Sequence, residues 1–305
     1  MCSSDLQYPT KPITIVCGFL AGGAADLVSR MTAERLAAEF GRQVLVENRP
    51  GAGSAIAAER VAKAAPDGYT LLHGTAAGLI INQLLSKKLP YDAARDFTPV
   101  SMVVIVPQLL VVHPAVPANT LKEFIALAKA RPGTLNYGSV GVGSPNHLGM
   151  ELLKLAAGID VVHVPYKGAT PAMADLMAGQ VQAAFNGMAS VMPLIASGKL
   201  RAIAIGSAKR SPAAPDVPTV AESGYAGFEY VAWNGNFAPA KTPAAIIAKI
   251  SADIGKALAT PDVVQRLASL GSEAAPSTPQ QFAAYVKEDY ARWARVVKTL
   301  GLKSE

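Results

Sequence analysis

One unit near the N-terminus, a strand followed by a glycine loop and a helix start, limits most strongly how this chain can fold. An apolar run containing Ile13, Ile15 and Val16 leads into Gly-Phe-Leu-Ala-Gly-Gly at residues 18–23, and a helical pattern follows. Adjacent glycines let the backbone approach another group closely, and the next helix directs unpaired N–H groups into the same space. The loop is therefore either an anion-binding loop or only a tight strand-to-helix turn.

The same unit recurs along the chain and predicts an α/β fold. Small residues follow an apolar strand at residues 74–78, and Gly-Val-Gly-Ser-Pro follows a second strand at 141–145. A third helix start is expected at Thr170-Pro171, because Ser or Thr caps a helix and proline suits its first position. Ligands collect at the carboxyl ends of strands in open α/β sheets, so the loops after residues 17 and 73 are expected to lie side by side.

The length of 305 residues predicts two lobes, because one hydrophobic core rarely serves so long a chain. The apolar stretch 100–112 is expected to be a buried strand that crosses between the lobes, and residues 228–237 the return crossing. Lobe 1 is predicted to begin with residues 8–102. Residues 103–226 form lobe 2, and residues 227–305 return to lobe 1 and add the C-terminal helices.

Composition excludes several classes of protein. Half of the residues are apolar and 16% are charged, which excludes disorder, and no apolar run reaches the ~18 residues of a membrane span. A net charge of +6 without a basic cluster argues against nucleic acid and favours small anionic ligands. Cys2 and Cys17 lack metal-site spacing, so neither a metal nor a cofactor is expected. Cys17 is expected to be a buried thiol, with a Cys2–Cys17 disulfide as the alternative.

Catalytic motifs do not occur in the sequence. The histidines at 73, 113, 147 and 163 are scattered, and G-x-S-x-G, P-loop, H-E-x-x-H and G-x-G-x-x-G patterns are missing. The chain is therefore expected not to be an enzyme. A hydrolase or transferase with a distributed site that uses Ser139 or Ser144 is the alternative.

Single residues near the loops have predicted roles. Asp26 is expected to accept hydrogen bonds from loop N–H groups and brace the loop, since a carboxylate that faced an anion would repel it. Trp233 is expected to pack behind the site. His147 either donates to an anion or fills space, and Lys167 either pairs with the ligand or is solvated. Asn186 ends a strand and is a candidate polar contact.

An ordered set of short motifs between about Tyr8 and Leu300 resembles the Bug family, the periplasmic receptors of tripartite tricarboxylate transporters. The motifs are Tyr8-Pro9-x-Lys11-Pro12, Gly18-Phe19-x-x-Gly22-Gly23-x-x-Asp26, Val46-Glu47-Asn48-Arg49-Pro50-Gly51-Ala52-Gly53, Pro66-Asp67-Gly68-Tyr69-Thr70-Leu71-Leu72, Leu89-Pro90-Tyr91-Asp92, His163-Val164-Pro165-Tyr166-Lys167-Gly168 and Asp216-Val217-Pro218-Thr219.

The resemblance implies a type II periplasmic binding protein fold, with two α/β lobes joined by crossing strands around a ligand cleft. It implies a monomeric receptor that closes on a small carboxylate by hinge motion and delivers it to a membrane permease. It also implies a periplasmic location, reached through a signal peptide that this sequence lacks. A receptor that signals to a sensor kinase would use the same ligand site and is a further alternative.

The resemblance also assigns ligand contacts to backbone groups and hydroxyls. Together with the candidates above, the predicted ligand-binding residues are Phe19, Ala21, Gly22, Gly23, Thr75, Ala76, Ser139, Gly143, Ser144, His147, Tyr166, Lys167 and Asn186, with Asp26 and Trp233 behind them. Gly18 and Leu20 depart from the family pattern and predict a looser, more apolar rim. Asn186 stands where many members carry aspartate, which disfavours an amino-acid ligand and favours a dicarboxylate or aromatic carboxylate.

Overall fold

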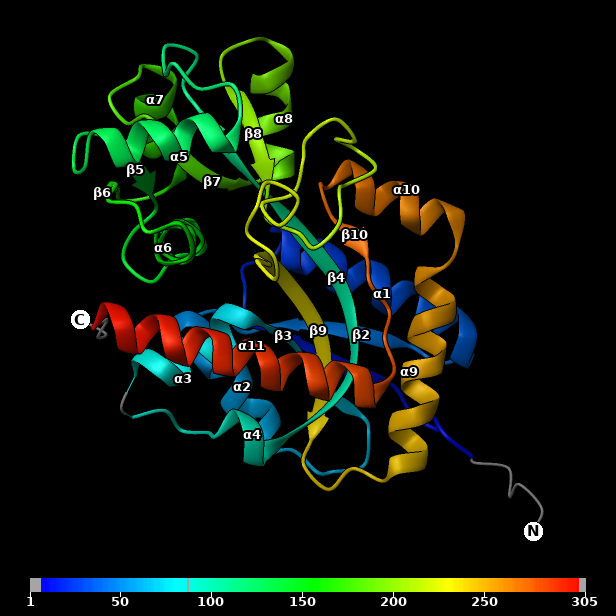
Figure 1. Ribbon diagram of the computed structural model, residues 1–305. Coiled ribbons are helices and arrows are strands. Elements are labelled where there is room, and N and C mark those ends of the chain that lie inside the picture. Colours follow the sequence, from blue (N-terminus) through cyan, green and yellow to red (C-terminus); the bar gives the residue numbers. More distant parts are fainter. Residues whose placement is uncertain (1–6, 87, 302–305) are drawn as a thin grey trace. The chain divides into compact units, whose positions relative to one another are not determined.

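A computed structural model describes residues 7–86 and 88–301 as two compact α/β units (Figure 1). Unit 1 contains the described residues up to Ile105, Trp233–Leu267 and those from Ala274 onward, and unit 2 contains Val106–Ala232 and Ala268–Glu273. The chain therefore changes unit within a strand at residues 105/106 and again at 232/233. The lobe boundaries expected from the sequence, 102/103 and 226/227, stay predictions.

The strands of unit 1 form a sheet in the order β2-β1-β3-β9-β4, and β10 also pairs with β4. Strands β2 and β3 flank β1 in parallel, and β9 is antiparallel to β3. Its elements are β1 (Ile13–Cys17), α1 (Ala24–Phe40), β2 (Val44–Asn48), the 3-10 helix η1 (Ala52–Ser54), α2 (Ala55–Ala62), β3 (Thr70–Thr75), the π-helix η2 (Ala77–Ile81), α3 (Asn82–Leu85), α4 (Ala93–Asp96), the first part of β4 (Phe97–Val112), most of β9 (Val231–Pro239), α9 (Ala244–Leu258), α10 (Pro261–Ser269) up to Leu267, the second residue of β10 (Glu273–Ala274) and α11 (Pro279–Leu300).

Parallel pairing brings the predicted loops of unit 1 together. Cys17, the last residue of β1, lies opposite His73 of β3, so both strands end at the same edge of the sheet. The loop that starts at Gly18 and the loop that starts at Ala76, after the last β3 residue Thr75, therefore follow neighbouring strands, which confirms the expectation that these loops are adjacent.

Successive side chains of β9 point to opposite faces of the sheet, and each face packs against a different set of helices in unit 1. Ala238 joins a buried cluster with residues of α1 and α9 on one face. On the other face Gly235 lies so close to α11 that a Cβ atom would be 2.3 Å from Phe282 Cζ. Trp233 is 1% exposed there, and its Nε1 donates to Asp289 Oδ2 at 2.8 Å. Trp233 is therefore a core residue of this unit.

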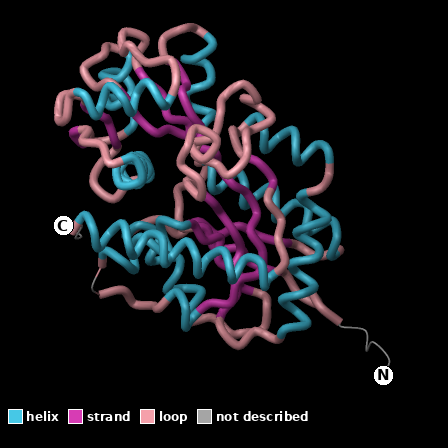
Figure 2. The backbone as a smooth tube through the Cα atoms, viewed as in Figure 1, coloured by secondary structure: helices cyan, strands magenta, loops and turns pink. Residues whose placement is uncertain are grey.

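Unit 2 also combines helices with strands (Figure 2). Its sheet order is β4-β7-β5-β6, and β8 pairs with β4. Strand β5 is parallel to β6 and β7, whereas β4 is antiparallel to β7 and β8. A buried cluster that contains Leu109, Leu176 and Val191 packs α7 and α8 against the sheet. The remaining elements are α5 (Leu121–Ala130), β5 (Asn136–Ser139), α6 (Pro145–Ala157), β6 (Val162–Pro165), α7 (Ala169–Met177), β7 (Ala183–Gly187), α8 (Met188–Ala196) and β8 (Arg201–Ile205).

The helices α5, α6 and α11 each begin directly after a serine or threonine whose side chain caps the helix. Thr120 and Thr278 form capping boxes, and Ser144 caps α6 with Pro145 at its first position. The start expected at Thr170-Pro171 was wrong, because α7 begins at Ala169 with Gly168 as its N-cap. Gly168 has φ +118°, a conformation that a threonine rarely adopts, and the turn into the helix is made two residues earlier than expected.

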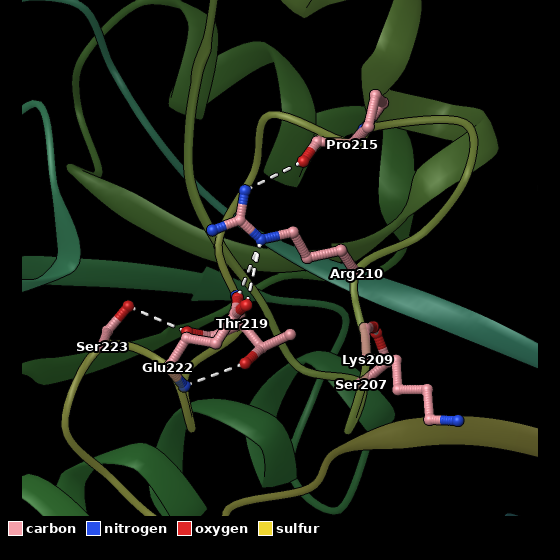
Figure 3. A network of polar contacts seen from close by, with 7 residues as sticks. All are labelled: Ser207, Lys209, Arg210, Pro215, Thr219, Glu222 and Ser223. Carbon is pink, nitrogen blue, oxygen red and sulfur yellow. Dashed lines mark hydrogen bonds and ion pairs between the residues drawn. The ribbon is translucent and has the colours of Figure 1, made fainter.

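A polar network gives the proline-rich loop 206–223 of unit 2 a defined shape (Figure 3). The Nε atom of Arg210 donates to both carboxylate oxygens of Glu222, at 2.9 and 3.2 Å, and its Nη1 donates to the carbonyl oxygen of Pro215. Thr219 and Glu222 exchange side chain to backbone hydrogen bonds in the manner of a capping box. The loop is therefore held by its own side chains.

Cys17 is a fully buried thiol that forms no disulfide among the described residues. Cys2, its possible disulfide partner, lies outside the described residues. Within the part of the chain that the structure describes, no helix is both long and apolar enough to cross a membrane. The described residues also contain no group of three or more His, Cys, Asp or Glu side chains that could hold a metal ion.

Candidate ligand-binding site

The glycine loop of unit 1 leads into a helix that no side chain caps. Helix α1 begins at Ala24 with Gly23 as its N-cap, and no side-chain capping hydrogen bond is formed there. Gly22 has φ +83°, and Gly22, Gly23 and Ala21 are exposed while Phe19 is half-buried. The first N–H groups of a helix have no partner within it, so those of α1 are left for solvent or a ligand. The positive end of the helix dipole favours an anion at this position.

A buried carboxylate braces this loop from behind. Asp26 is 1% exposed, and its Oδ2 accepts hydrogen bonds from Gly22 N at 2.8 Å and from Arg30 Nε at 2.9 Å. Its Oδ1 accepts from Asn48 Nδ2, which also donates to the carbonyl oxygen of Phe19. Burial opposes ionisation, but the hydrogen bonds from Arg30, Gly22 and Asn48 hold the pKa of Asp26 below its usual value. The expected Asp26–loop contact is therefore present.

Sequence reasoning missed the other two members of this brace. Asn48 ends β2, and Arg30 lies one turn after Asp26 in α1 and donates to Asn48 Oδ1 at 2.9 Å. The i, i+4 spacing of Asp26 and Arg30 is a signal that the sequence does contain. The contribution of Asn48 depends on the pairing of β1 with β2 and has no local signal.

Gly18 is closely packed, so the looser rim that the sequence predicted at this position was wrong. A Cβ atom on Gly18 would lie 1.9 Å from the Oγ atom of Ser54. Ser54 is buried and has φ 79°, in the left-handed region, as do Ala52 and Gly53 before it. Only glycine at residue 18 leaves room for this turn. Leu20, by contrast, is 72% exposed and does add apolar surface beside the loop.

The loop after β3 is shaped by the π-helix that follows it. Thr75 is buried, and its Oγ1 accepts a hydrogen bond from Gly78 N at 3.1 Å. The hydroxyl of Tyr91 donates to the carbonyl oxygen of Gly78 at 2.6 Å. Thr75 therefore fixes the start of η2, while Ala76 is half-buried at the end of the strand. Their contact with a ligand stays a prediction.

In unit 2 the loop between β5 and α6 is closed by its own hydrogen bonds. Ser144 Oγ donates to the carbonyl oxygen of Gly141 at 2.6 Å, and Gly143 N donates to Nδ1 of His147 at 3.1 Å. Ser139 Oγ lies 3.1 Å from both the N and the O atoms of Gly141. Ser139, Gly143, Ser144 and His147 are thus brought together, as four predicted ligand residues around one turn.

His163, which the sequence did not indicate as a site residue, belongs to the same cluster. Its Nε2 lies 2.6 Å from Ser139 Oγ, and its ring stacks on that of His147 with the centroids 4.2 Å apart. Tyr137 stacks on His163 at 4.9 Å, and its hydroxyl donates to Glu151. These side chains come from β5, β6 and α6, so no spacing in the sequence could have revealed them as one group.

Both histidines are held in their neutral form. Burial lowers the pKa of His147, although the nearby Glu151 opposes the shift. Burial and the neighbouring His147 lower the pKa of His163 to about 4. The backbone N–H of Gly143 donates to His147 Nδ1, which requires that this nitrogen carry no proton.

The last three predicted residues of unit 2 have different surroundings. Tyr166 donates its hydroxyl to Asp175 Oδ2 at 2.7 Å, and burial together with this carboxylate raises the pKa of Tyr166 to about 12. Lys167 is exposed. Asn186 Oδ1 accepts from Asn146 Nδ2 at 2.8 Å, and the two amides line a cavity of about 10 Å³ together with Ser139. Asn146 is a further residue that the sequence did not indicate.

Comparisons with known proteins agree on one family. The model of the tripartite tricarboxylate transporter family receptor, TctC, matches residues 28–302. The protein BugT of Bordetella pertussis is 39% identical over 297 residues, which cover 97% of this chain and 91% of BugT. A UPF0065 protein of Pseudomonas sp. strain P51 is 37% identical, over 95% of this chain and 86% of its own length.

Solved structures give the same result. An R. palustris protein solved with adipate is 35% identical with a TM-score of 0.78, over 97% of this chain and 99% of its own. MatC from Rhodopseudomonas palustris with bound malate is 36% identical with a TM-score of 0.73, over 95% and 100%. The periplasmic binding protein BugD is 36% identical with a TM-score of 0.74, over 98% and 100%. These matches confirm the predicted fold class, and the chain belongs to the TctC family of tripartite tricarboxylate transporter receptors, which includes the Bug proteins.

Proposed function

We propose that this chain is an extracytoplasmic receptor that binds a small organic carboxylate, with a dicarboxylate or an aromatic carboxylate favoured, and presents it to the membrane permease of a tripartite transporter. The observation that carries the proposal is the uncapped first turn of α1 beside a glycine loop that Asp26 braces. Backbone N–H groups at a helix start suit a carboxylate without any charged side chain. Relatives with adipate or malate in their structures support this ligand class.

The predicted contacts of both units are kept in this proposal. In unit 1 these are Phe19, Ala21, Gly22, Gly23, Thr75 and Ala76, and in unit 2 the residues Ser139, Gly143, Ser144, His147, Tyr166, Lys167 and Asn186. The proposed location is the periplasm, supported by the family and by the periplasmic relative BugD. The proposed form is a monomer.

A ligand screen tests the proposal directly. The protein is unfolded and refolded to remove any carried-over ligand, and thermal unfolding and calorimetry are then measured with adipate, malate and aromatic carboxylates. A ligand at ~100 times its dissociation constant adds about 2.7 kcal/mol to the free energy of unfolding and should raise the melting midpoint. The uncharged diamides are controls and should have no effect. A protein that none of these acids stabilises would contradict the proposal.

A pair of matched variants tests the role of the α1 start. Ala24→Asp places a carboxylate at the first position of α1, where it suits the helix dipole but repels an anionic ligand. We expect unchanged or slightly higher stability and a loss of carboxylate binding of at least about tenfold. Ala244→Asp makes the same change at the first position of α9, a helix that likewise has no side-chain cap, and should leave binding unchanged. Equal carboxylate affinity in the two variants would show that the ligand does not bind at the start of α1.

A hydrolase is the second candidate, because Ser139 Oγ and His163 Nε2 lie 2.6 Å apart, as a nucleophile and its base do. Two observations count against it. Ser139 is 1% exposed, and Glu151, the carboxylate of this cluster, is bonded to Tyr137 and Lys154. Turnover of an ester or amide that is lost in both Ser139→Ala and His163→Gln would favour the hydrolase, and no turnover by the wild type would exclude these substrates.

A further inference from the structure

The two stacked histidines of unit 2 fix opposite ends of one loop. His163 lies 2.6 Å from Ser139 Oγ, which in turn contacts Gly141, whereas Nδ1 of His147 accepts the N–H of Gly143 at 3.1 Å. The backbone of residues 139–144 is therefore held through two imidazole rings. The contact of His147 needs an unprotonated Nδ1, whereas His163 Nε2 can donate to or accept from Ser139 Oγ.

A proton on His147 Nδ1 is incompatible with this loop. The nitrogen would become a donor that faces the N–H donor of Gly143, so one hydrogen bond would be replaced by repulsion. The stacked rings lie 4.2 Å apart, so a charge on one ring disfavours a charge on the other and the pair takes up its first proton as a unit. Loop geometry and proton uptake are therefore coupled.

The charged and titratable groups around the pair come from every element that packs against it. Tyr137 of β5 stacks on both rings, and Glu151 and Lys154 lie further along α6, where Lys154 Nζ donates to Glu151 Oε1 at 2.7 Å. Tyr230 packs against α6 at Gly149, and its hydroxyl donates to the carbonyl oxygen of Pro145. His147 also lies in the first turn of α6, where the helix dipole disfavours a cation. Glu151 favours a charge on the rings and Lys154, which is paired with Glu151, opposes it.

We propose that His147 and His163 are positioning residues that make carboxylate binding depend on pH, because the ligand-binding form of the 139–144 loop requires His147 Nδ1 to carry no proton and the stacked His163 influences proton uptake by that ring. This inference rests on the proposed function and adds its regulation. Acidification places a proton on the pair, frees Gly143 from His147 and weakens binding. Burial, which lowers the pKa of both histidines, places the change below the usual histidine range.

The first experiment needs no ligand. Backbone amide and histidine ring resonances are followed by NMR from pH 7.5 to 4.5 in the ligand-free protein. We expect the Gly143 amide to shift with the same midpoint as the His147 ring, and to lose this transition in His147→Asn, whose Oδ1 can accept the same hydrogen bond without titrating. A Gly143 amide that does not respond to pH, or that responds equally in His147→Asn, would overturn the proposal whether or not any carboxylate binds.

The second experiment measures adipate and malate affinity by calorimetry at pH 7.5 and 5.0. Protonation of the acids themselves affects all variants equally, so the comparison between proteins isolates the histidines. We expect the wild type to lose more affinity than His147→Asn, since at pH 5.0 part of the wild-type protein carries the proton on His147 that excludes the Gly143 contact. His113→Asn is the matched control, because His113 Nδ1 accepts the N–H of Ala115 at 3.2 Å but lies outside the cluster, and it should behave as the wild type.

Affinity that rises on acidification would instead mean that a charged histidine contacts the ligand and would refute the proposal. Failure of both acids to bind at pH 7.5 would count against the proposed function alone.

Discussion

At the scale of single residues, the candidate site depends on side chains that touch the loops from behind. Asp26 was predicted from the sequence to brace the loop, because a carboxylate that faced an anionic ligand would repel it. Besides the bond from Gly22 N, Asp26 accepts hydrogen bonds from Arg30 and Asn48, and Arg30 also donates to Asn48, so the three side chains form a network. A short carboxylate and an amide thus hold a loop that glycine alone would leave free to move.

Substitution of Asp26 tests this network. In Asp26→Asn one hydrogen-bond acceptor becomes a donor that faces Arg30 or Gly22, so we expect a loss of about 1–3 kcal/mol in the free energy of unfolding. We also expect carboxylate affinity to fall about tenfold, because Gly22 is no longer held. Asp253→Asn is the control, since Asp253 is equally buried and pairs with Lys249 and Lys256 on α9. Urea unfolding and calorimetry should show that Asp253→Asn lowers stability only, and equal affinity losses in both variants would argue against a specific brace.

At the scale of elements, the turn before α2 packs closely against Gly18, the residue directly after β1. Residues 52–54 all have left-handed backbone conformations, and Asn82 Nδ2 donates to the carbonyl oxygens of Ala52 and Gly53. Left-handed conformations cost non-glycine residues about 1 kcal/mol or more, so the surrounding contacts must maintain this turn. Through the contact of Ser54 with Gly18, this turn packs against the end of β1, where the glycine loop begins.

A variant cycle tests the contact. Gly18→Ala should lower the free energy of unfolding by about 1–3 kcal/mol, because its Cβ would overlap Ser54. Ser54→Gly removes both the overlap and the backbone strain, so the double variant should recover most of the loss. Gly255→Ala, in the interior of α9 with no atom near its Cβ, is the control and should stabilise by about 0.5–1 kcal/mol. Additive effects of Gly18→Ala and Ser54→Gly in chemical denaturation would disprove the coupling.

At the scale of the whole molecule, buried histidines in both units give stability the same dependence on pH. Burial lowers the pKa of His73 in unit 1 to about 4, and His163 in unit 2 is lowered similarly. Above pH 6.5 both are neutral in the folded and unfolded states. Below that pH the unfolded chain takes up protons first, so the folded state loses stability as the pH falls toward 4.

The pH dependence can be measured by chemical denaturation between pH 7.5 and 4.5. His73 alone should account for about 2.5 kcal/mol of lost stability by pH 4.5, because it is fully buried, and His163 for less, because it is partly exposed. His73→Leu should flatten the curve, whatever its effect at pH 7.5. An unchanged slope in His73→Leu would show that other groups cause the acid sensitivity.

The sequence by itself determined the features that depend on neighbours along the chain. The glycine loops after β1 and β5, the capping boxes at Thr120 and Thr278, the long apolar strand β4 and the family all follow from short, ordered patterns. Local chemistry suffices there, because a cap or a turn involves residues within four positions of one another.

Only the tertiary structure decided which distant residues meet. The stacking of His147 on His163, the placement of Ser54 against Gly18 and the return of residues 268–273 to unit 2 join elements that are separate in sequence. Such contacts depend on strand order, register and helix packing, which many sequences share and no local pattern specifies. The glycine loop could therefore be recognised from the sequence, whereas the side chains that hold it in place could be identified only after the chain had folded.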